Sequence, residues 1–292
     1  MSLKQESLNK TFGGELRKYS YQSQALGGLT TNLNVFLPPT AIGASAKPAP
    51  VLYYLAGLTC TEDNGAQKGG MFGAAASHGI ALVFPDTSPR GANIEGEDES
   101  WDFGTGAGFY VNADKAPWNK HYNTYDYVVR EIPAKLSEAG LPIAVEKASI
   151  FGHSMGGHGA LSIYLREAGK YKSASAFAPI SHPTACPWGE KAFSGYFNDA
   201  AKGKEHDSTE LISQTGGPSK RQLNILIDSG TGDNFYKQKQ LLPEDFEAAA
   251  RKAGYDAKDV NVRLQEGYDH SYFFISTFAG EHINWHAKFL TA

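Results

Sequence analysis

The stretch Lys147–Leu165, KASIFGHSMGGHGALSIYL, decides the fold that this chain is expected to adopt. Its opening residues, through Phe151, are typical of a buried strand, and the residues from Ala160 onward are typical of a helix. Between them lies a G-x-S-x-G match centred on Ser154. The match alone is weak in a chain with 32 glycines. Its place between a strand and a helix predicts a strained turn that projects Ser154 as a nucleophile.

Short β-rich runs alternate with helical patterns on both sides of this stretch, which predicts an α/β fold. Two early alternating runs, Glu15–Ser23 and Thr31–Leu37, predict antiparallel strands. Compact apolar runs of the buried-strand type follow at Val51–Ala56, Ile80–Phe84, Ala148–Phe151, Ser173–Phe177, Leu223–Ile227 and Val260–Leu264. We expect a mostly parallel central sheet flanked by helices on both faces, which is the α/β-hydrolase fold.

Helical patterns fall between these runs. They cover Tyr125–Glu138 with Thr124 as a possible cap, the residues after Ser154, Pro243–Ala253, and Ser271 to about Leu290. We expect one domain spanning residues 1–292. The segment 181–222 is predicted to be an excursion over the strand ends and the active site.

Composition limits the classes of function. The chain has 292 residues, of which 41% are hydrophobic and 20% charged, and this balance is typical of a globular protein. A net charge of -4 does not favour nucleic-acid binding. The polar N-terminus predicts no signal peptide, and no apolar run is long enough to span a membrane, so we expect a cytoplasmic protein. Two cysteines, Cys60 and Cys186, are expected to be free thiols in a reducing compartment.

A serine nucleophile needs a base and an acid, which follow it along this fold in the order Ser, Asp/Glu, His. His270 follows the run Val260–Leu264 and is the predicted base. Two acids follow or end the run before it. Asp228 ends the strand and Asp233 lies in the loop beyond, where the triad acid usually stands, so we favour Asp233 and keep Asp228 as the alternative.

Two backbone N–H groups should form the oxyanion hole. One is that of Met155, directly after the nucleophile. The second is expected from Leu58, in the loop after Val51–Ala56, where Gly57 would permit the backbone turn. His153, inside the elbow, is expected to point away from the nucleophile.

Three other patterns favour simpler interpretations. The glycines of Gly104–Gly108 do not follow a buried strand, so a dinucleotide site is not expected. His282 and His286 are spaced like a zinc pair but have no third ligand, which favours surface or core-edge histidines. The acidic residues around Glu97 lack the spacing of a calcium loop. We expect no cofactor and no metal.

Five separated motifs in order make the chain resemble the S-formylglutathione hydrolase family, also called esterase D, from about Phe12 to the C-terminus. The motifs are Gly57–Thr61, Trp101–Gly104 with Gly106–Tyr110, Gly152–Gly157, Pro187–Gly189 and Gln265–Tyr272.

The resemblance implies hydrolysis of S-formylglutathione to glutathione and formate, with side activity on short-chain carboxylic esters. It places the triad on Ser154, Asp233 and His270, which favours Asp233 over Asp228. It also implies that Cys60 is a thiol near the active serine and that Trp188 is a wall of the active site. The partners implied are a small-molecule substrate and a second copy of the chain in a cytosolic homodimer.

Three alternatives remain at this point. The physiological reaction could be general short-chain ester hydrolysis, or acyl transfer to an alcohol such as a sugar. The chain could also be a catalytically inactive binding module on a hydrolase scaffold. The filled serine, aspartate and histidine positions argue against that last alternative.

Overall fold

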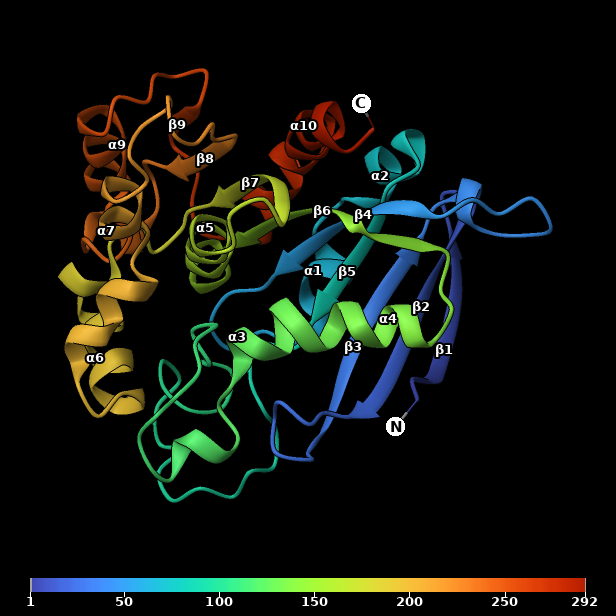
Figure 1. Cartoon of the computed structure of the whole chain (residues 1–292), viewed down its shortest axis with the longest axis horizontal. Helices are drawn as coiled ribbons and strands as arrows, with labels where there is room; N and C mark the ends of the chain where they lie inside the picture. Colours follow the sequence, from blue (N-terminus) through green and yellow to red (C-terminus); the bar gives the residue numbers. More distant parts are fainter. Residues whose placement is uncertain (1, 292) are drawn as a thin grey trace.

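A nine-stranded sheet forms the centre of this computed structural model, which describes residues 2–291 (Figure 1). The sheet order is β1-β2-β3-β5-β4-β6-β7-β8-β9. Pairing is antiparallel from β1 through β3 to β5 and parallel from β5 to β9. The predicted α/β architecture with antiparallel N-terminal strands is therefore confirmed.

All eight predicted strands are present. The strands of the sheet are β1 (Lys4–Thr11), β2 (Gly14–Gln22), β3 (Thr30–Leu37), β4 (Ala49–Leu55), β5 (Ala81–Pro85), β6 (Ile143–His153), β7 (Tyr171–Phe177), β8 (Ile225–Gly230) and β9 (Val260–Gln265). The sequence pattern missed β1, because this edge strand reads KQESLNKT and is exposed along almost its whole length. Polar, lysine-bearing edge strands are common because they discourage pairing with other chains.

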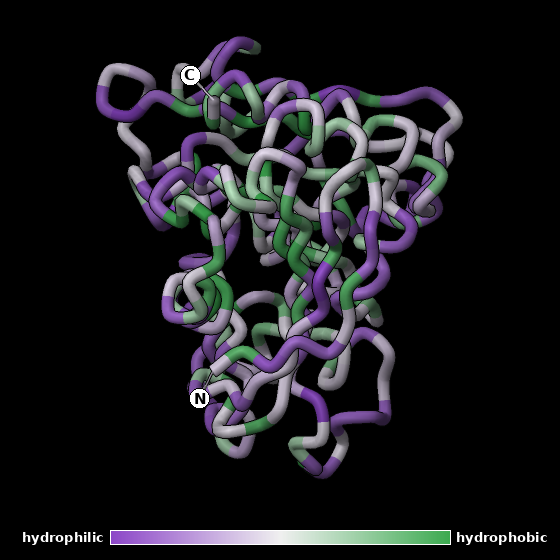
Figure 2. Tube along the Cα trace, turned by 90° about the vertical axis from the view of Figure 1, so that its right-hand side faces the viewer, coloured by the Kyte–Doolittle hydropathy of each residue, from purple (hydrophilic) through white to green (hydrophobic). Residues whose placement is uncertain are grey.

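Helices pack on both faces of the sheet. The helices α1 (Glu62–Lys68), α2 (Phe72–His78) and α10 (Tyr272–Leu290) pack against β3, β5, β6 and β7. The helices α4 (Ile132–Glu138) and α5 (Met155–Arg166) pack against β4, β6 and β7, and α9 (Pro243–Lys252) packs against β9. Hydrophobic segments concentrate in the interior of the molecule, whereas many turns at its periphery are hydrophilic (Figure 2).

The helix predicted at Tyr125–Glu138 forms as one run with a change of hydrogen bonding inside it. It consists of α3 (Thr124–Asp126), a π-helical turn η3 (Tyr127–Glu131) and α4. Thr124 does not cap it, contrary to the expectation. Its hydroxyl donates to the carbonyl oxygens of Gly108 (2.9 Å) and Val111 (3.2 Å), and so ties the helix start to the preceding glycine-rich loop.

Residues 181–222 contain four short helices beyond the carboxyl end of β7. They are η4 (Pro183–Ala185), α6 (Pro187–Tyr196), η5 (Ala200–His206) and α7 (Ser208–Ser213). Whether this segment acts as a cover over the active site stays a prediction. Three more short helices complete the described chain: η1 (Pro39–Ala41), η2 (Trp118–Lys120) and α8 (Asn234–Lys237).

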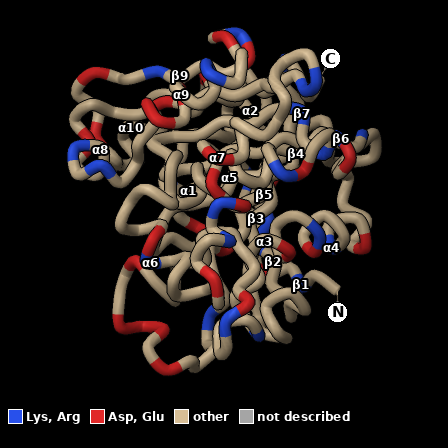
Figure 3. Tube along the Cα trace, turned by 60° about the vertical axis from the view of Figure 1, so that its left-hand side comes forward, with Lys and Arg blue, Asp and Glu red and all other residues tan. Residues whose placement is uncertain are grey.

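Charged residues of both signs are interspersed over the outer loops and helices (Figure 3). This distribution agrees with the small net charge of -4. Within residues 2–291, no helix is both long enough and apolar enough to cross a membrane.

Candidate active site

Ser154 stands on a strained turn between β6 and α5. Its φ of 58° and ψ of -119° lie in a region that non-glycine residues rarely occupy. The Ser154 N–H donates to the Phe177 carbonyl oxygen at the end of β7 (2.9 Å). An added Cβ at Gly156 would lie 2.0 Å from the Leu55 carbonyl oxygen, so this position needs glycine for close approach. Packing of the elbow against neighbouring strands thus holds the strained serine in place.

Asp233 and His270 form a hydrogen-bonded pair at the same edge of the sheet. Asp233 begins α8, and one of its carboxylate oxygens accepts the Phe235 N–H (2.7 Å). The other lies 2.5 Å from Nδ1 of His270, which follows β9 and precedes α10. Asp233 is fully buried, which leaves its carboxylate committed to these partners. The pair therefore fixes the proton of His270 on Nδ1 and leaves Nε2 as the acceptor.

Asp228, the alternative acid, has different partners. It lies within β8 and accepts hydrogen bonds from Arg263 (2.5 Å and 2.7 Å), Gln265 (3.0 Å) and His282 Nε2 (2.9 Å). Burial alone would raise the pKa of Asp228, but the hydrogen bonds from His282 and Arg263 lower it to about 2. Asp228 is therefore a fully paired carboxylate, and the structure gives His270 to Asp233.

Ser154 and His270 line one hollow of about 190 Å³, called here the Ser154 hollow. Within the described residues, no hydrogen bond joins the two side chains, and such contacts often tighten only when substrate binds. Leu58, Cys60 and Trp188, singled out from the sequence, also line it. The remaining lining residues are Gly57, Thr59, Trp101, His153 and Phe235.

An aromatic wall encloses much of this hollow. The Trp188 ring packs edge-on to Trp101 (5.5 Å between centroids) and against Phe235 (4.6 Å). Phe235 also packs edge-on to His270 (4.8 Å). Trp101 and Phe235 were not predicted as site residues. Phe235 lies two positions after Asp233, the favoured triad acid. Its closeness to that residue in the sequence could have marked it as a wall of the site.

The Leu58 and Met155 amides are placed beside the nucleophile. Within the described residues, neither N–H has a backbone acceptor, and Met155 is the first residue of α5. Gly57 is needed for a reason other than the predicted turn. Its backbone has no positive φ, but an added Cβ would lie 3.1 Å from Cβ of Ser154. The left-handed residue of this loop is Thr59, with a φ of 67°.

The glycine-rich loop Gly104–Gly108 supports this amide-bearing loop. Thr59 N–H donates to the Gly106 carbonyl oxygen (2.9 Å), and an added Cβ on Gly106 would lie 3.0 Å from Cα of Thr59. Gly106 therefore allows two backbones to pack closely.

His153 does not point away from the site, contrary to the expectation. Its ring lines the Ser154 hollow and packs 4.4 Å from the His270 ring. Neither ring nitrogen has a hydrogen-bond partner in the described part of the chain. Burial, together with the neighbouring His270, holds the pKa of His153 well below its usual range. His153 is therefore a neutral ring packed against the His270 face.

Both cysteines are free thiols, as predicted. Cys60 is partly buried at the Ser154 hollow, with the Tyr272 hydroxyl beside its sulfur. Burial raises the pKa of the Cys60 thiol. A thiol that stays protonated at neutral pH is a poor nucleophile.

The proposed zinc spacing at His282 and His286 has another explanation. Both side chains are fully buried, not at the surface or core edge, and both bond Ser175 Oγ (2.8 Å each). Across residues 2–291, no group of three or more metal-ligating side chains is arranged to hold a metal ion.

Comparisons with known proteins identify the family of the chain. The Esterase family model matches residues 23–291. An S-formylglutathione hydrolase of Rattus norvegicus is 52% identical over 295 residues, which cover all of both chains. One of Arabidopsis thaliana is 51% identical over 96% of this chain and 95% of its own. A solved S-formylglutathione hydrolase from Agrobacterium tumefaciens superposes with a TM-score of 0.90 at 41% identity, covering 99% of this chain and 100% of that one.

Proposed function

Because this chain belongs to the S-formylglutathione hydrolase family of esterases, we propose that it hydrolyses S-formylglutathione to glutathione and formate. A side activity on short-chain carboxylic esters belongs to the same proposal. The observation that carries it is the meeting of Ser154, the Asp233–His270 pair and the Leu58 loop around one small hollow. A formyl group is the smallest acyl group, so a hollow of about 190 Å³ with aromatic walls suits it.

In the proposed acylation step, His270 Nε2 takes the proton of the Ser154 hydroxyl as Oγ attacks the formyl carbon. The Leu58 and Met155 amides donate hydrogen bonds to the oxyanion that forms. The carbon–sulfur bond then breaks, glutathione leaves as the thiolate, and the proton on His270 neutralises it. Asp233 stabilises the imidazolium and holds its orientation throughout.

Deacylation follows with water in place of the thiol. His270 takes a proton from a water molecule while the water oxygen attacks the formyl-serine carbon. The Leu58 and Met155 amides bind the second oxyanion. The bond between the carbon and Ser154 Oγ breaks, formate leaves, and the serine recovers its proton. A thiolate is a good leaving group, so positioning and the oxyanion hole should matter more than proton donation in acylation.

The proposal includes two neighbours of the triad and two features of the whole protein. Trp188 would form a wall against the acyl group, and Cys60 would lie close enough for a thiol reagent to block the site sterically. The family resemblance supports a cytosolic homodimer, and the net charge of -4 does not favour a nucleic-acid partner. Light scattering on the purified chain tests the dimer directly.

The decisive experiment compares kcat/KM for S-formylglutathione, short nitrophenyl esters, and acyl transfer from one such ester to an alcohol. We expect S-formylglutathione to be the best substrate, with only minor transfer. A higher kcat/KM for the simple esters would favour a general carboxylesterase. Dominant product from the alcohol would favour an acyltransferase, and absence of labelling by a fluorophosphonate would favour an inactive module.

A further inference from the structure

The leaving tripeptide must lie beside His270, because this residue would deliver the proton that the thiolate needs. His270 is followed directly by Ser271, Tyr272 and Phe273 at the start of α10. Two hollows flank these residues outside the Ser154 hollow. One is lined by Lys68, Ser271, Tyr272, Phe273 and Ser276 and measures about 400 Å³; we call it the Lys68 hollow.

The second, the Asp269 hollow, measures about 470 Å³ and is lined by His270 itself. Its charged lining residues are Asp233, whose carboxylate bonds His270, and the exposed Asp269. No lysine or arginine lines it. Glutathione carries two carboxylates and one ammonium, so its net charge is negative, and this acidic hollow is unfavourable for it.

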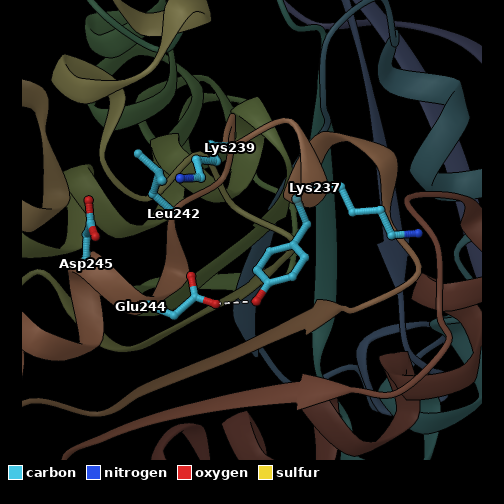
Figure 4. Close-up of a pocket in the computed structure, with 6 residues that line it drawn as sticks. Lys237, Lys239, Leu242, Glu244 and Asp245 are labelled. Atoms are coloured by element: carbon cyan, nitrogen blue, oxygen red, sulfur yellow. Dashed lines mark hydrogen bonds between the residues drawn. The ribbon is translucent and has the colours of Figure 1, made fainter.

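A third hollow of about 410 Å³ contains lysines but is separated from the chemistry (Figure 4). Lys237 and Lys239 line it together with two acids, Glu244 and Asp245. The Glu244 carboxylate accepts the Tyr236 hydroxyl, while the Lys237 side chain points away from that pair (Figure 4). None of Ser154, His270 or the Leu58 loop lines this hollow.

Of the three, only the Lys68 hollow is lined by a cation and no acid, and its link to the Ser154 hollow is Tyr272, which packs against His153. The acids of α1 that could have neutralised Lys68, Glu62 and Asp63, both pair with Lys18 instead. Lys68 is exposed and forms no ion pair within residues 2–291.

Tyr272 forms the border between the two hollows. Its ring lines the Lys68 hollow, packs 6.1 Å from the His153 ring and places its hydroxyl beside Cys60. Next to it, Phe273 is 84% exposed, the most exposed large hydrophobic side chain in the described chain. Phe273 therefore offers apolar surface at the edge of the Lys68 hollow.

The backbone holds Lys68 next to the start of α10. Lys68 ends α1, and the following turn at Gly70, with a φ of 68°, packs against Ser276 of α10. The hollow also faces the N-terminal turn of a 19-residue helix, whose positive end favours anions.

We propose that the Lys68 hollow binds the tripeptide moiety of the thioester, with Lys68 Nζ pairing with a tripeptide carboxylate and Phe273 covering its apolar part. The inference rests on the proposed function and deepens it, because it names the residues that would distinguish S-formylglutathione from a simple formyl or acetyl ester.

The test is a cycle of two enzymes and two substrates. Wild type and Lys68→Ala are assayed with S-formylglutathione and with its diethyl ester, in which both carboxylates are masked, by following loss of the thioester. We expect Lys68→Ala to lower kcat/KM for S-formylglutathione about fivefold, as for an exposed ion pair, through KM, with a smaller loss for the diester. Lys68→Arg should restore most of the difference, and Lys239→Ala, the matched control from the third hollow, should change neither substrate.

A separate readout does not depend on thioester turnover. S-methylglutathione should inhibit hydrolysis of a nitrophenyl ester competitively, and Lys68→Ala should raise its inhibition constant by a similar factor. Equal losses on both thioesters, with an unchanged inhibition constant, would overturn the Lys68 assignment while leaving the proposed function intact. A different outcome would overturn the proposed function and support the subsite. In that outcome the wild type has a higher kcat/KM for simple esters than for S-formylglutathione, while Lys68→Ala still raises the inhibition constant of S-methylglutathione.

Discussion

Two serine–histidine–aspartate chains meet near the carboxyl end of β8, and their acids are only five positions apart. The open chain joins Asp233 to His270, which faces the hollow that contains Ser154. The closed chain joins Asp228 to His282 (2.9 Å) and His282 to Ser175 (2.8 Å). It continues through His286 to Ser173 (2.7 Å) and then to Ser149 (2.7 Å). The same residue types thus occur in two sites of opposite character.

The closed chain has no group left over for chemistry. Asp228 is a carboxylate because the pKa of its side chain is about 2, so His282 Nε2 must donate to it. The Ser175 hydroxyl then donates to His282 Nδ1, and Ser175 Oγ accepts the N–H of His286 Nε2. The Ser173 hydroxyl donates to His286 Nδ1. Every hydroxyl proton is used, and all these side chains are fully buried. The network ties α10 to the sheet.

The open chain differs in access and in strain. Ser154 has a positive φ that lifts it out of the strand, whereas Ser175 lies within the regular strand β7. The pairing of Asp233 leaves Nε2 of His270 without a committed partner at a hollow. A nucleophilic triad therefore requires a serine and a histidine nitrogen that are accessible and have no hydrogen-bond partner, and not only the three residue types in contact.

The largest expected effect is the loss of activity in Ser154→Ala. We expect kcat on a formyl thioester to fall by about a millionfold, the typical cost of removing a triad nucleophile, and a fall of less than about a thousandfold would be too small for that role. The matched variant is Ser175→Ala, which should keep kcat within a few-fold. It should instead lose about 1–3 kcal/mol of unfolding free energy, because two buried imidazole nitrogens lose their partner. Residual activity in Ser154→Ala above about a thousandth of wild type would remove the open chain as the catalytic triad.

The next largest effect is expected from Asp233→Asn. An amide cannot hold the His270 tautomer as a carboxylate does, so kcat should fall by about ten thousandfold, with little change in stability. Asp269→Asn is the control, since Asp269 lies next to His270 in the chain but bonds Ser271. Steady-state kinetics on the same thioester should show less than a few-fold change for this control. Equal losses in both variants would mean that Asp269 shares the role.

Asp228→Asn should have the opposite effect to Asp233→Asn: it should lower stability and leave kcat nearly unchanged. The substitution removes the buried carboxylate that Arg263 and His282 share, while Arg263 keeps its pair with Glu281, so we expect a cost of about 1–3 kcal/mol. Urea denaturation should therefore show this loss of unfolding free energy, while kcat of the folded enzyme stays within a few-fold of wild type. A drop in kcat comparable to that of Asp233→Asn would contradict the distinction drawn between the chains.

The sequence predicted the open chain much better than the closed one. The elbow and the order Ser, Asp, His follow from the predicted strands, because Ser154, Asp233 and His270 each lie in the loop after one of them. The choice of Asp233 over Asp228 was left open by the residues alone and was favoured by the family resemblance. His282 and His286 lie on one helix four residues apart, a spacing that suits a metal pair or a buried face equally well. Only the packing of α10 against Ser175 decides between them.

The parts of the site that the sequence missed depend on tertiary contacts. His153 was expected to point away from the nucleophile because of its place inside the elbow, but its ring packs against His270 and lines the Ser154 hollow. Trp101 comes from an irregular loop far from the triad in sequence. No periodicity marks such residues, because a loop meets its partners through the folds of other segments.

The smallest effect concerns pH and tests whether the two histidines of the closed chain, His282 and His286, are neutral in the folded protein. Burial holds the pKa of His286 well below its usual range, and burial lowers the pKa of His282 as well. Below about pH 6.5 these imidazoles bind protons in the unfolded state but stay neutral in the folded state. The unfolding free energy should therefore fall as the pH decreases from about 6.5. The buried His158, with a pKa of about 4, adds about 2 kcal/mol to this loss at about pH 5.

His286→Gln measures the share of the closed chain in this pH dependence. Glutamine keeps a donor and an acceptor for Ser175 and Ser173 but removes one group that titrates on unfolding. The slope of unfolding free energy against pH should therefore decrease by about 1.4 kcal/mol per pH unit between about pH 6 and 4.5, as expected for one proton. Denaturant titrations at several pH values measure this slope. An unchanged slope would show that His286 takes up a proton in the folded state, and the fixed direction of hydrogen bonds inferred for the closed chain would then be wrong.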